Sequence, residues 1–369
     1  MDVLSFLRTI RRKLSQFRSY QKLHSIKDRF LFQRWAKQTI KEDCGAILLG
    51  TPEHTNIGDS AIVLAEVAFL KKHLPERSRI AEMTVSDVKS YWDAVMHRIR
   101  ANNKLVCHWH GGGNMGDQWL SEELFRRRTM QSIPQNPTIV FPQTIYYTDT
   151  ETGKREKTES IQFYNDRSNL TLVAREKKSE FLMKELYPKT EVLLTPDIVL
   201  STTMDQYGVK KQERNNVMFC VRADAEKRVD DSVWNILEKD FNDLGLDCFK
   251  TDMHSVKPVT KENRADRVRE KMQEFCGARL VVTDRLHGMI FAALTGTPCI
   301  VFSNYNHKVK GTYDFISYLP YIKYAETVEQ AESYIPDLLE MQNCEYDNEP
   351  LKPYFDELKK KILELTNNV

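Results

Sequence analysis

The feature that most constrains the fold of this chain is a regular alternation of short apolar runs with helical patterns. Strands that alternate with helices predict parallel sheets covered by helices on both faces. The expected strands are 46–49, 105–109, 138–141, 171–174 and 192–194 in the first half, and 217–221, 247–250, 280–283 and 298–302 in the second. The expected helices between them are 61–72, 176–186, 231–244, 265–276 and 287–294.

A polar stretch over 201–216 divides this pattern into two blocks, and a length of 369 residues also suggests two domains. The sequence therefore predicts an α/β protein with two Rossmann-like domains whose parallel sheets face a central cleft. Ligands of such sheets bind beyond the carboxyl ends of the strands. We expect a basic helical segment over 1–41, a first domain over 42–205, a second over 206–330 and C-terminal helices over 331–369.

Residues 1–41 carry eleven Lys and Arg against only Asp2 and Asp28, whereas the rest of the chain has 43 basic and 50 acidic side chains. Leu7, Ile10 and Leu14 fall on one helical face of this segment. Such a helix suits an anionic membrane surface. It equally suits packing on its own protein or on a second subunit. Nucleic acid is not an expected partner, because the remainder is acidic and contains no known nucleic-acid module.

Seven cysteines are scattered along the chain without a CxxC pair. This usage argues against a disulfide framework and for a reducing compartment. No secretory signal or membrane-spanning stretch is visible in the sequence. We therefore expect a cytoplasmic protein, with a peripheral place on the inner face of the plasma membrane if residues 1–41 bind lipid.

The first loop with a chemical signal is 50–59, directly after the first expected strand. Gly58 permits a tight turn, and Asp59 or Ser60 can cap the following helix. The free N–H groups of a helix N-terminus suit a phosphate or carboxylate. Asn56 is a candidate ligand-binding residue, although a purely structural turn fits this loop equally well.

The second loop, 108–117, contains three consecutive glycines directly after a strand. Gly112 and Gly113 would let the backbone approach a ligand closely, with N–H groups forming an anion nest. His110 would lie at the edge of the cleft, whereas His108 is more plausibly buried and structural. Neither a metal site nor a dinucleotide site is expected, because the spacing of acids, cysteines and glycines fits neither.

The third and fourth loops place charged side chains after strands 171–174 and 280–283. Arg175 would point into the cleft, where a guanidinium can bind a carboxylate or phosphate bidentately, although this loop taken alone favours a structural pair of Arg175 with Glu176. Asp284, Arg285 and His287 crowd the start of an otherwise apolar helix. Cations at a helix N-terminus oppose the helix dipole, and a bound anion would relieve this conflict. Asp284 would hold Arg285 or His287 in place.

The segments TNIGDSAI, HGGGNMGD, FPQTI, AREKKS, TPDIVL and TDRLHGMIFAALTGTPCIVF follow one another between about residues 45 and 310. Together they resemble the polysaccharide pyruvyl transferase family. The resemblance implies a fold like that of GT-B glycosyltransferases, and by analogy a C-terminal helix near 354–365 that crosses back to the first domain. One departure is Thr55, where many members have Gly.

The resemblance also implies transfer of the pyruvate skeleton of phosphoenolpyruvate to sugar hydroxyls as a ketal, in exopolysaccharide, capsule or cell-wall polysaccharide synthesis. It carries functional roles over to Arg175, Arg285, Leu286 and His287, and with them His110. Phosphoenolpyruvate would be a co-substrate, with no cofactor or metal. The acceptor would be a sugar, which the family's biology suggests is carried on a lipid-linked oligosaccharide.

On this hypothesis His287 is the general acid/base, because histidine titrates near neutral pH. Arg175 and Arg285 bind the donor and stabilise the leaving phosphate. The expected acceptor and loop contacts are Asn56, Asp59, Asn114 and Asp117. Two rival hypotheses are a GT-B glycosyltransferase that uses a nucleotide sugar and a non-enzymatic scaffold on the membrane surface.

Overall fold

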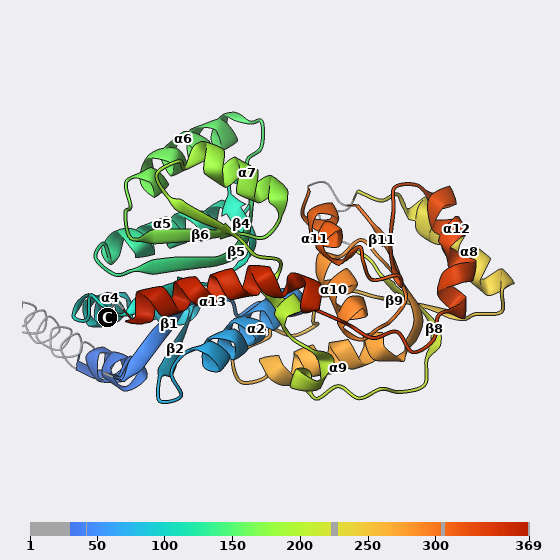
Figure 1. The fold of residues 1–369 in the computed structure, drawn as a ribbon, viewed down its shortest axis with the longest axis horizontal. Helices are drawn as coiled ribbons and strands as arrows, with labels where there is room; N and C mark the ends of the chain where they lie inside the picture. The colour runs from blue at the N-terminus through green and yellow to red at the C-terminus, as the bar shows by residue number, and fades with distance from the viewer. Residues whose placement is uncertain (1–29, 42, 223–227, 304–306, 368–369) are drawn as a thin grey trace, which may run out of the picture.

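The computed structural model describes residues 30–41, 43–222, 228–303 and 307–367, which form two α/β domains side by side (Figure 1). In the first domain, the strand order β2-β1-β3-β5-β6-β7 makes an all-parallel sheet, and β4 pairs with β5. Its strands are β1 (Cys44–Thr51), β2 (Arg79–Thr84), β3 (Val106–Trp109), β4 (Gly112–Gly116), β5 (Thr138–Tyr146), β6 (Leu170–Ala174) and β7 (Glu191–Leu194). Its helices are α2 (Ile57–His73), α3 (Val85–Ser90), α4 (Trp92–Arg100), α5 (Leu120–Ser132), α6 (Glu151–Asn165) and α7 (Lys177–Leu186).

The second domain has a five-stranded parallel sheet in the order β12-β11-β10-β8-β9. Its strands are β8 (Asn215–Cys220), β9 (Cys248–Thr251), β10 (Ala278–Thr283), β11 (Cys299–Phe302) and β12 (Ile322–Ala325). Its helices are α8 (Asp231–Asp243), α9 (Arg264–Gly277), α10 (Leu286–Leu294), α11 (Lys308–Ile316) and α12 (Val328–Glu340). Short 3-10 turns η1 (Ile198–Ser201), η2 (Met204–Tyr207) and η3 (Glu349–Leu351) lie in the connections, and α13 (Lys352–Asn367) ends the described chain.

Each sheet reverses its strand order at the first strand of its domain, β1 or β8. In the first sheet β2 adds to one side of β1 and β3 to the other, and in the second β9 and β10 flank β8 in the same way. Loops that leave the carboxyl ends of two such strands diverge to opposite faces and open a crevice that binds ligands. The loops after β1, β3, β8 and β10 are therefore the places to look for a site.

The two domains share a large packed interface. Helices α2 and α9 lie side by side between the sheets (Figure 1), and Phe69 of α2 and Met272 of α9 belong to one buried apolar cluster. Polar contacts cross the same boundary. The Arg264 guanidinium lies 2.7 Å from Glu82 Oε1 and donates to the carbonyl of Pro52 at 3.2 Å.

Helix α13 crosses from the second domain back along the first (Figure 1). Phe355, Leu358 and Ile362 of this helix are buried in the shared apolar cluster. Lys361 Nζ reaches Glu191 Oε2 of β7 at 2.8 Å. This is the crossing that the family resemblance implied.

Most of the basic N-terminal segment, residues 1–29, lies outside the described residues, so the amphipathic helix expected there is not assessed. Residues 30–39 are helical. The Trp35 ring stacks on Tyr91 with centroids 4.1 Å apart, and Arg98 Nε donates to the carbonyl of Ile40 at 2.9 Å. This described part packs on its own domain. No helix among the described residues combines the length and the apolar character needed to cross a membrane.

All nine expected strands are present, but β2, β4 and β12 were not predicted. Strands β2 and β12 each lie at one edge of a sheet, and charged side chains interrupt their short runs. The opposite edge strands, β7 and β9, were predicted. Strand β4 is the glycine run itself, which has little intrinsic preference for a strand.

Candidate active site

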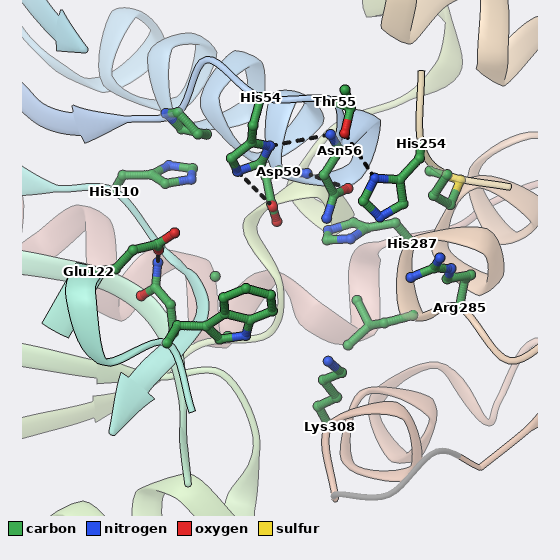
Figure 2. A pocket seen from close by; sticks show the side chains of 18 of the residues that line it. His54, Thr55, Asn56, Asp59, His110, Glu122, His254, Arg285, His287 and Lys308 are labelled. Atoms are coloured by element: carbon green, nitrogen blue, oxygen red, sulfur yellow. Dashed lines mark hydrogen bonds and ion pairs between the residues drawn. The ribbon is translucent and has the colours of Figure 1, made fainter. Parts of the chain in front are cut away.

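A pocket of about 450 Å³ lies between the domains, at the two places where the strand order reverses (Figure 2). The first domain lines it with loop residues after β1 and β3 and with Arg175 after β6. The second domain supplies residues after β8, β9, β10 and β11. The lining residues are Pro52, His54, Thr55, Asn56, Asp59, His110, Gly111, Gly112, Gly113, Asn114, Trp119, Glu122, Arg175, Arg222, Met253, His254, Arg285, Leu286, His287 and Lys308.

Asp197 joins a cation from each domain beneath this pocket. Its Oδ2 atom lies 3.1 Å from Arg175 Nη1 and 3.4 Å from His287 Nε2. Burial alone would raise the pKa of Asp197, but the charges of His287 and Arg175 and the N–H of Val199 outweigh it and lower the pKa to about 2. The carboxylate is therefore ionised at neutral pH.

The position of His287 depends on the glycine in the first loop. A Cβ atom on Gly58 would lie 2.3 Å from His287 Nδ1, so only glycine lets the ring approach the start of α2. Asn56 caps this helix, and its Oδ1 accepts from the N–H of Gly58 at 2.9 Å and of Asp59 at 3.4 Å. Asn56 thus has a structural role in a loop that also lines the pocket.

Arg285 and Asp284 have partners other than those expected. Asp252, after β9, lies 2.7 Å from both Nε and Nη2 of Arg285. Asp284 Oδ1 instead accepts from the N–H of Arg222 at 2.9 Å, and Asp284 does not line the pocket. Burial raises the pKa of Asp284 to about 6, against the N–H of Arg222 and the charge of Arg285, which lower it. The expectation that Asp284 holds Arg285 or His287 is therefore corrected: Asp252 and Asp197 do so.

His110 is held by Glu66, a residue that the sequence analysis did not identify. His110 Nδ1 lies 2.8 Å from Glu66 Oε2, and Glu66 Oε1 accepts from the N–H of Gly111 at 2.7 Å. Gly112 has a φ of +133°, a conformation that favours glycine, and nothing would meet a Cβ there within 4 Å. The glycine run therefore presents bare backbone to the pocket.

His108 is fully buried, packs near Phe141 and lies outside the pocket lining, as a structural histidine would. Burial lowers its pKa to about 4, despite backbone contacts that raise it. Among the residues that the structure describes, no three His, Cys, Asp or Glu side chains are grouped so as to hold a metal ion.

The structure places Asn114 in the pocket lining and Asp117 outside it. Asn114 lines the pocket, where its amide donates to Glu122 and its Oδ1 accepts from Arg126 Nη2 at 2.8 Å. Asp117 lies outside the lining, and its Oδ1 accepts from the N–H of Thr148 at 2.8 Å. Asp117 therefore fixes the turn before α6 and does not face a ligand in this pocket.

The loop 52–59 is tied to the second domain. Ile57 N donates to the carbonyl of Met253 at 2.8 Å, and Thr55 Oγ1 lies 3.0 Å from His254 Nδ1 (Figure 2). His254 and Asp252 were not predicted as site residues. Their only signal was the location of their loop, directly after the expected strand 247–250.

Thr144 of the FPQTI segment anchors the third loop. Its Oγ1 accepts from Arg175 Nη2 at 2.8 Å and donates to Glu176 Oε2 at 2.8 Å. Glu176 is fully buried and lies 3.2 Å from His307 Nε2 of the second domain. Glu176 thereby links the first-domain side of the site to the start of α11.

Comparisons with known proteins identify the family of this chain. A family model described as polysaccharide pyruvyl transferase matches residues 56–307, which include the last three loops and the end of the first. General stress protein 30 of Bacillus subtilis is 34% identical over 315 residues, covering 84% of this chain and 90% of that protein. Pyruvyl transferase 1 of Schizosaccharomyces pombe is 29% identical over 271 residues, covering 70% of this chain and 65% of that protein.

The crystal structure of an uncharacterized Klebsiella pneumoniae protein has a similar fold, with a TM-score of 0.55 at 16% identity over 82% of this chain and 98% of that one. The family match covers well over half of the chain and contains Arg175, Arg285, Leu286, His287 and His110 in one ordered set of motifs. The chain therefore belongs to the polysaccharide pyruvyl transferase family.

Proposed function

We propose that this transferase binds phosphoenolpyruvate in the interdomain pocket and transfers its pyruvate skeleton to two hydroxyls of a sugar as a ketal. The observation that carries the proposal is the convergence of Arg175, Arg285 and His287 on one pocket from two strand ends, one in each domain. Arg175 lies more than a hundred positions before Arg285 and His287 in the sequence, so their meeting is a property of the fold.

The charges of the pocket fit a small polyanion. Its lining contains the four cations Arg175, Arg222, Arg285 and Lys308 and the two carboxylates Asp59 and Glu122. A carboxylate and a phosphate on one three-carbon unit need at least two separate donors, and Arg forks and backbone N–H groups supply them. The glycine run after His110 offers such N–H groups on the side opposite Arg285.

Ketal formation requires one proton to reach the methylene carbon of the donor, which becomes a methyl group. The central carbon then carries oxocarbenium character, bonds to one sugar oxygen and loses phosphate, and the second sugar oxygen takes its place. Both hydroxyls lose their protons, one of which balances the methyl group and the other the departing phosphate. The reaction therefore needs a group that both gives and accepts protons at neutral pH.

His287 is our candidate for this group. Asp197 faces Nε2 of its ring, while the Nδ1 side packs beside Gly58 at the start of α2. A carboxylate behind one ring nitrogen fixes the tautomer and stabilises the imidazolium that forms when the other takes a proton. Arg175 shares Asp197 and would stabilise the leaving phosphate from the first domain.

A ligand panel by calorimetry and thermal shift tests the donor. Phosphoenolpyruvate is compared with UDP, GDP and CMP sugars, on the wild type, on Arg285→Ala and on the control Arg269→Ala. Arg269 is half exposed on α9 and pairs with Asp266 outside the pocket. We expect phosphoenolpyruvate alone to bind, and Arg285→Ala to weaken it roughly 10- to 100-fold. Stabilisation by a nucleotide sugar instead would replace this proposal with glycosyl transfer.

We further propose that the acceptor belongs to a surface-polysaccharide precursor on a lipid-linked oligosaccharide at the cytoplasmic face of the membrane. The basic residues within 1–29 support this location through their charge alone. Deletion of 1–29 keeps Trp35 on Tyr91 and should abolish binding to anionic liposomes. Equal binding by the deleted protein would rule out this role for the segment.

A further inference from the structure

The buried carboxylate of Glu66 does not itself line the active-site pocket, but it contacts His110, which does. Glu66 lies in α2, is fully buried and does not line the pocket. Its two oxygens are divided between His110 Nδ1 at 2.8 Å and the N–H of Gly111 at 2.7 Å. Burial, together with the charge of Asp197, raises the pKa of Glu66, against His110 and the N–H of Gly111, which lower it. An ionised Glu66 is therefore stable here only with a proton on the histidine.

We propose that Glu66 is a positioning residue that holds His110 as an imidazolium cation, with Nε2–H directed at an acidic group of the donor; this role rests on the proposed function. One oxygen fixes the ring and its charge, and the other fixes the start of the glycine run. Glu66 therefore couples the side-chain donor of this loop to its backbone donors.

The charged groups around His110 favour the cation. Glu66 and Asp59 belong to α2, and Arg264 projects from α9. Burial alone would lower the pKa of His110, but the carboxylate of Glu66 at hydrogen-bond distance, assisted by Asp59, outweighs both burial and the charge of Arg264 and raises it. His110 is then charged at pH values where an ordinary histidine has lost its proton.

The geometry directs this charge at a ligand. His110 lines the pocket, and its ring extends from the end of β3 toward the cavity (Figure 2). The backbone of Gly112 and Gly113 lies beside it in the same lining, and Arg175 Nη2 would be 3.1 Å from a Cβ on Gly113. A phosphate or carboxylate that contacts the glycine backbone would thus meet His110 on one side and Arg175 on the other.

The test uses Glu66→Gln in the full-length protein. Gln keeps an oxygen for Gly111, but its amide donates to His110 Nδ1 and leaves the ring neutral, with its proton on Nε2. NMR titration of the histidine rings, assigned with His110→Ala, measures the pKa of His110 without any ligand. We expect a value above the ordinary one in the wild type and a clear decrease in Glu66→Gln.

Calorimetry with phosphoenolpyruvate at pH 6 and pH 8 gives the second measurement. We expect Glu66→Gln to weaken binding about tenfold at pH 8 and less at pH 6, because the neutral ring loses a charge-assisted hydrogen bond. Glu66→Asp should restore part of the affinity at pH 8. In the His110→Ala background, Glu66→Gln should add no further loss.

The control is Glu156→Gln, another buried glutamate, which pairs with Arg127 away from the pocket. It should leave the pKa of His110 and the affinity at both pH values unchanged. A neutral His110 at pH 7 in the wild type, or an equal loss of affinity at pH 6 and pH 8, would overturn the inference. Failure of phosphoenolpyruvate to bind the wild type would instead refute the proposed function, while the titration still tests the Glu66–His110 pair.

Discussion

Replacement of Asp197 by Asn tests the electrostatic centre of the site through stability alone. The pKa of Asp197 is about 2 against an ordinary value of 3.8, which corresponds to about 2 kcal/mol of stability at neutral pH. Asn also leaves Arg175 and His287 without their shared carboxylate, and breaking a buried ion pair costs roughly 3–5 kcal/mol. We therefore expect Asp197→Asn to lower the free energy of unfolding by about 2–5 kcal/mol at pH 7.

The sign of the pH dependence follows from the direction of the shift. A lowered pKa means that the folded state favours the ionised carboxylate, so its contribution is complete above the unfolded pKa and lost as pH falls toward 2. At pH 3 about half of the charge contribution should remain. The difference between wild type and Asp197→Asn should therefore shrink between pH 5 and pH 3, by about 1 kcal/mol.

Urea denaturation of both proteins at pH 7, 5, 4 and 3 gives this difference directly, because titration of all other groups is common to both. The control is Asp43→Asn, which removes the half-exposed ion pair with Arg79 and should cost about 1 kcal/mol or less. Equal stability of Asp197→Asn and wild type at pH 7, or a loss that does not change down to pH 3, would refute the reasoning.

Three further substitutions address the site and its frame. Gly58→Ala should reduce phosphate release from phosphoenolpyruvate about 10²-fold with unchanged helical content by circular dichroism, because the new Cβ would lie 2.3 Å from His287 Nδ1; a rate near that of the wild type would show that the ring's place is unimportant. His287→Ala should cost at least about 10²-fold in the same assay while phosphoenolpyruvate affinity changes less, and a folded variant with normal turnover would remove His287 from proton transfer. Gly116→Ala should destabilise the protein by about 2 kcal/mol or more in urea, because φ is +117° and a Cβ would lie 1.9 Å from the Tyr146 carbonyl. Gly245→Ala, with φ of +75° but open space, should cost less, and an equal loss would assign the effect to backbone strain alone.

The sequence predicted the interior strands of both sheets except β4, the outer strands β7 and β9, and the loops that follow them. Periodicity is informative there because interior strands of a parallel sheet are continuously apolar. It failed for β2 and β12, whose outer location leaves polar side chains in the run. Arg285 and His287 were predicted from a local conflict, cations at the start of an apolar helix, and Arg175 from its place at a strand end and the family resemblance.

The residues that hold these groups were harder to predict, since nothing local distinguishes them. Glu66 is one acid within a helix whose pattern is otherwise ordinary, and Asp252 lies in a loop without glycines. Each contacts a pocket residue because the fold places it beside a basic side chain far away in sequence. A single sequence shows that such acidic residues exist, but only the tertiary structure shows which basic side chains they contact.

The same contacts that assemble the pocket also fix the two domains relative to each other. Ile57 begins α2, and its N–H bonds to the carbonyl of Met253 of the second domain. Asp197 of the first domain faces His287 of the second. Because the catalytic geometry and the interface share these groups, a change in domain orientation would separate His287 from both Asp197 and Gly58. On the mechanism proposed above, the packed α2–α9 interface would serve catalysis as well as stability, since it holds His287 and Asp197 in register.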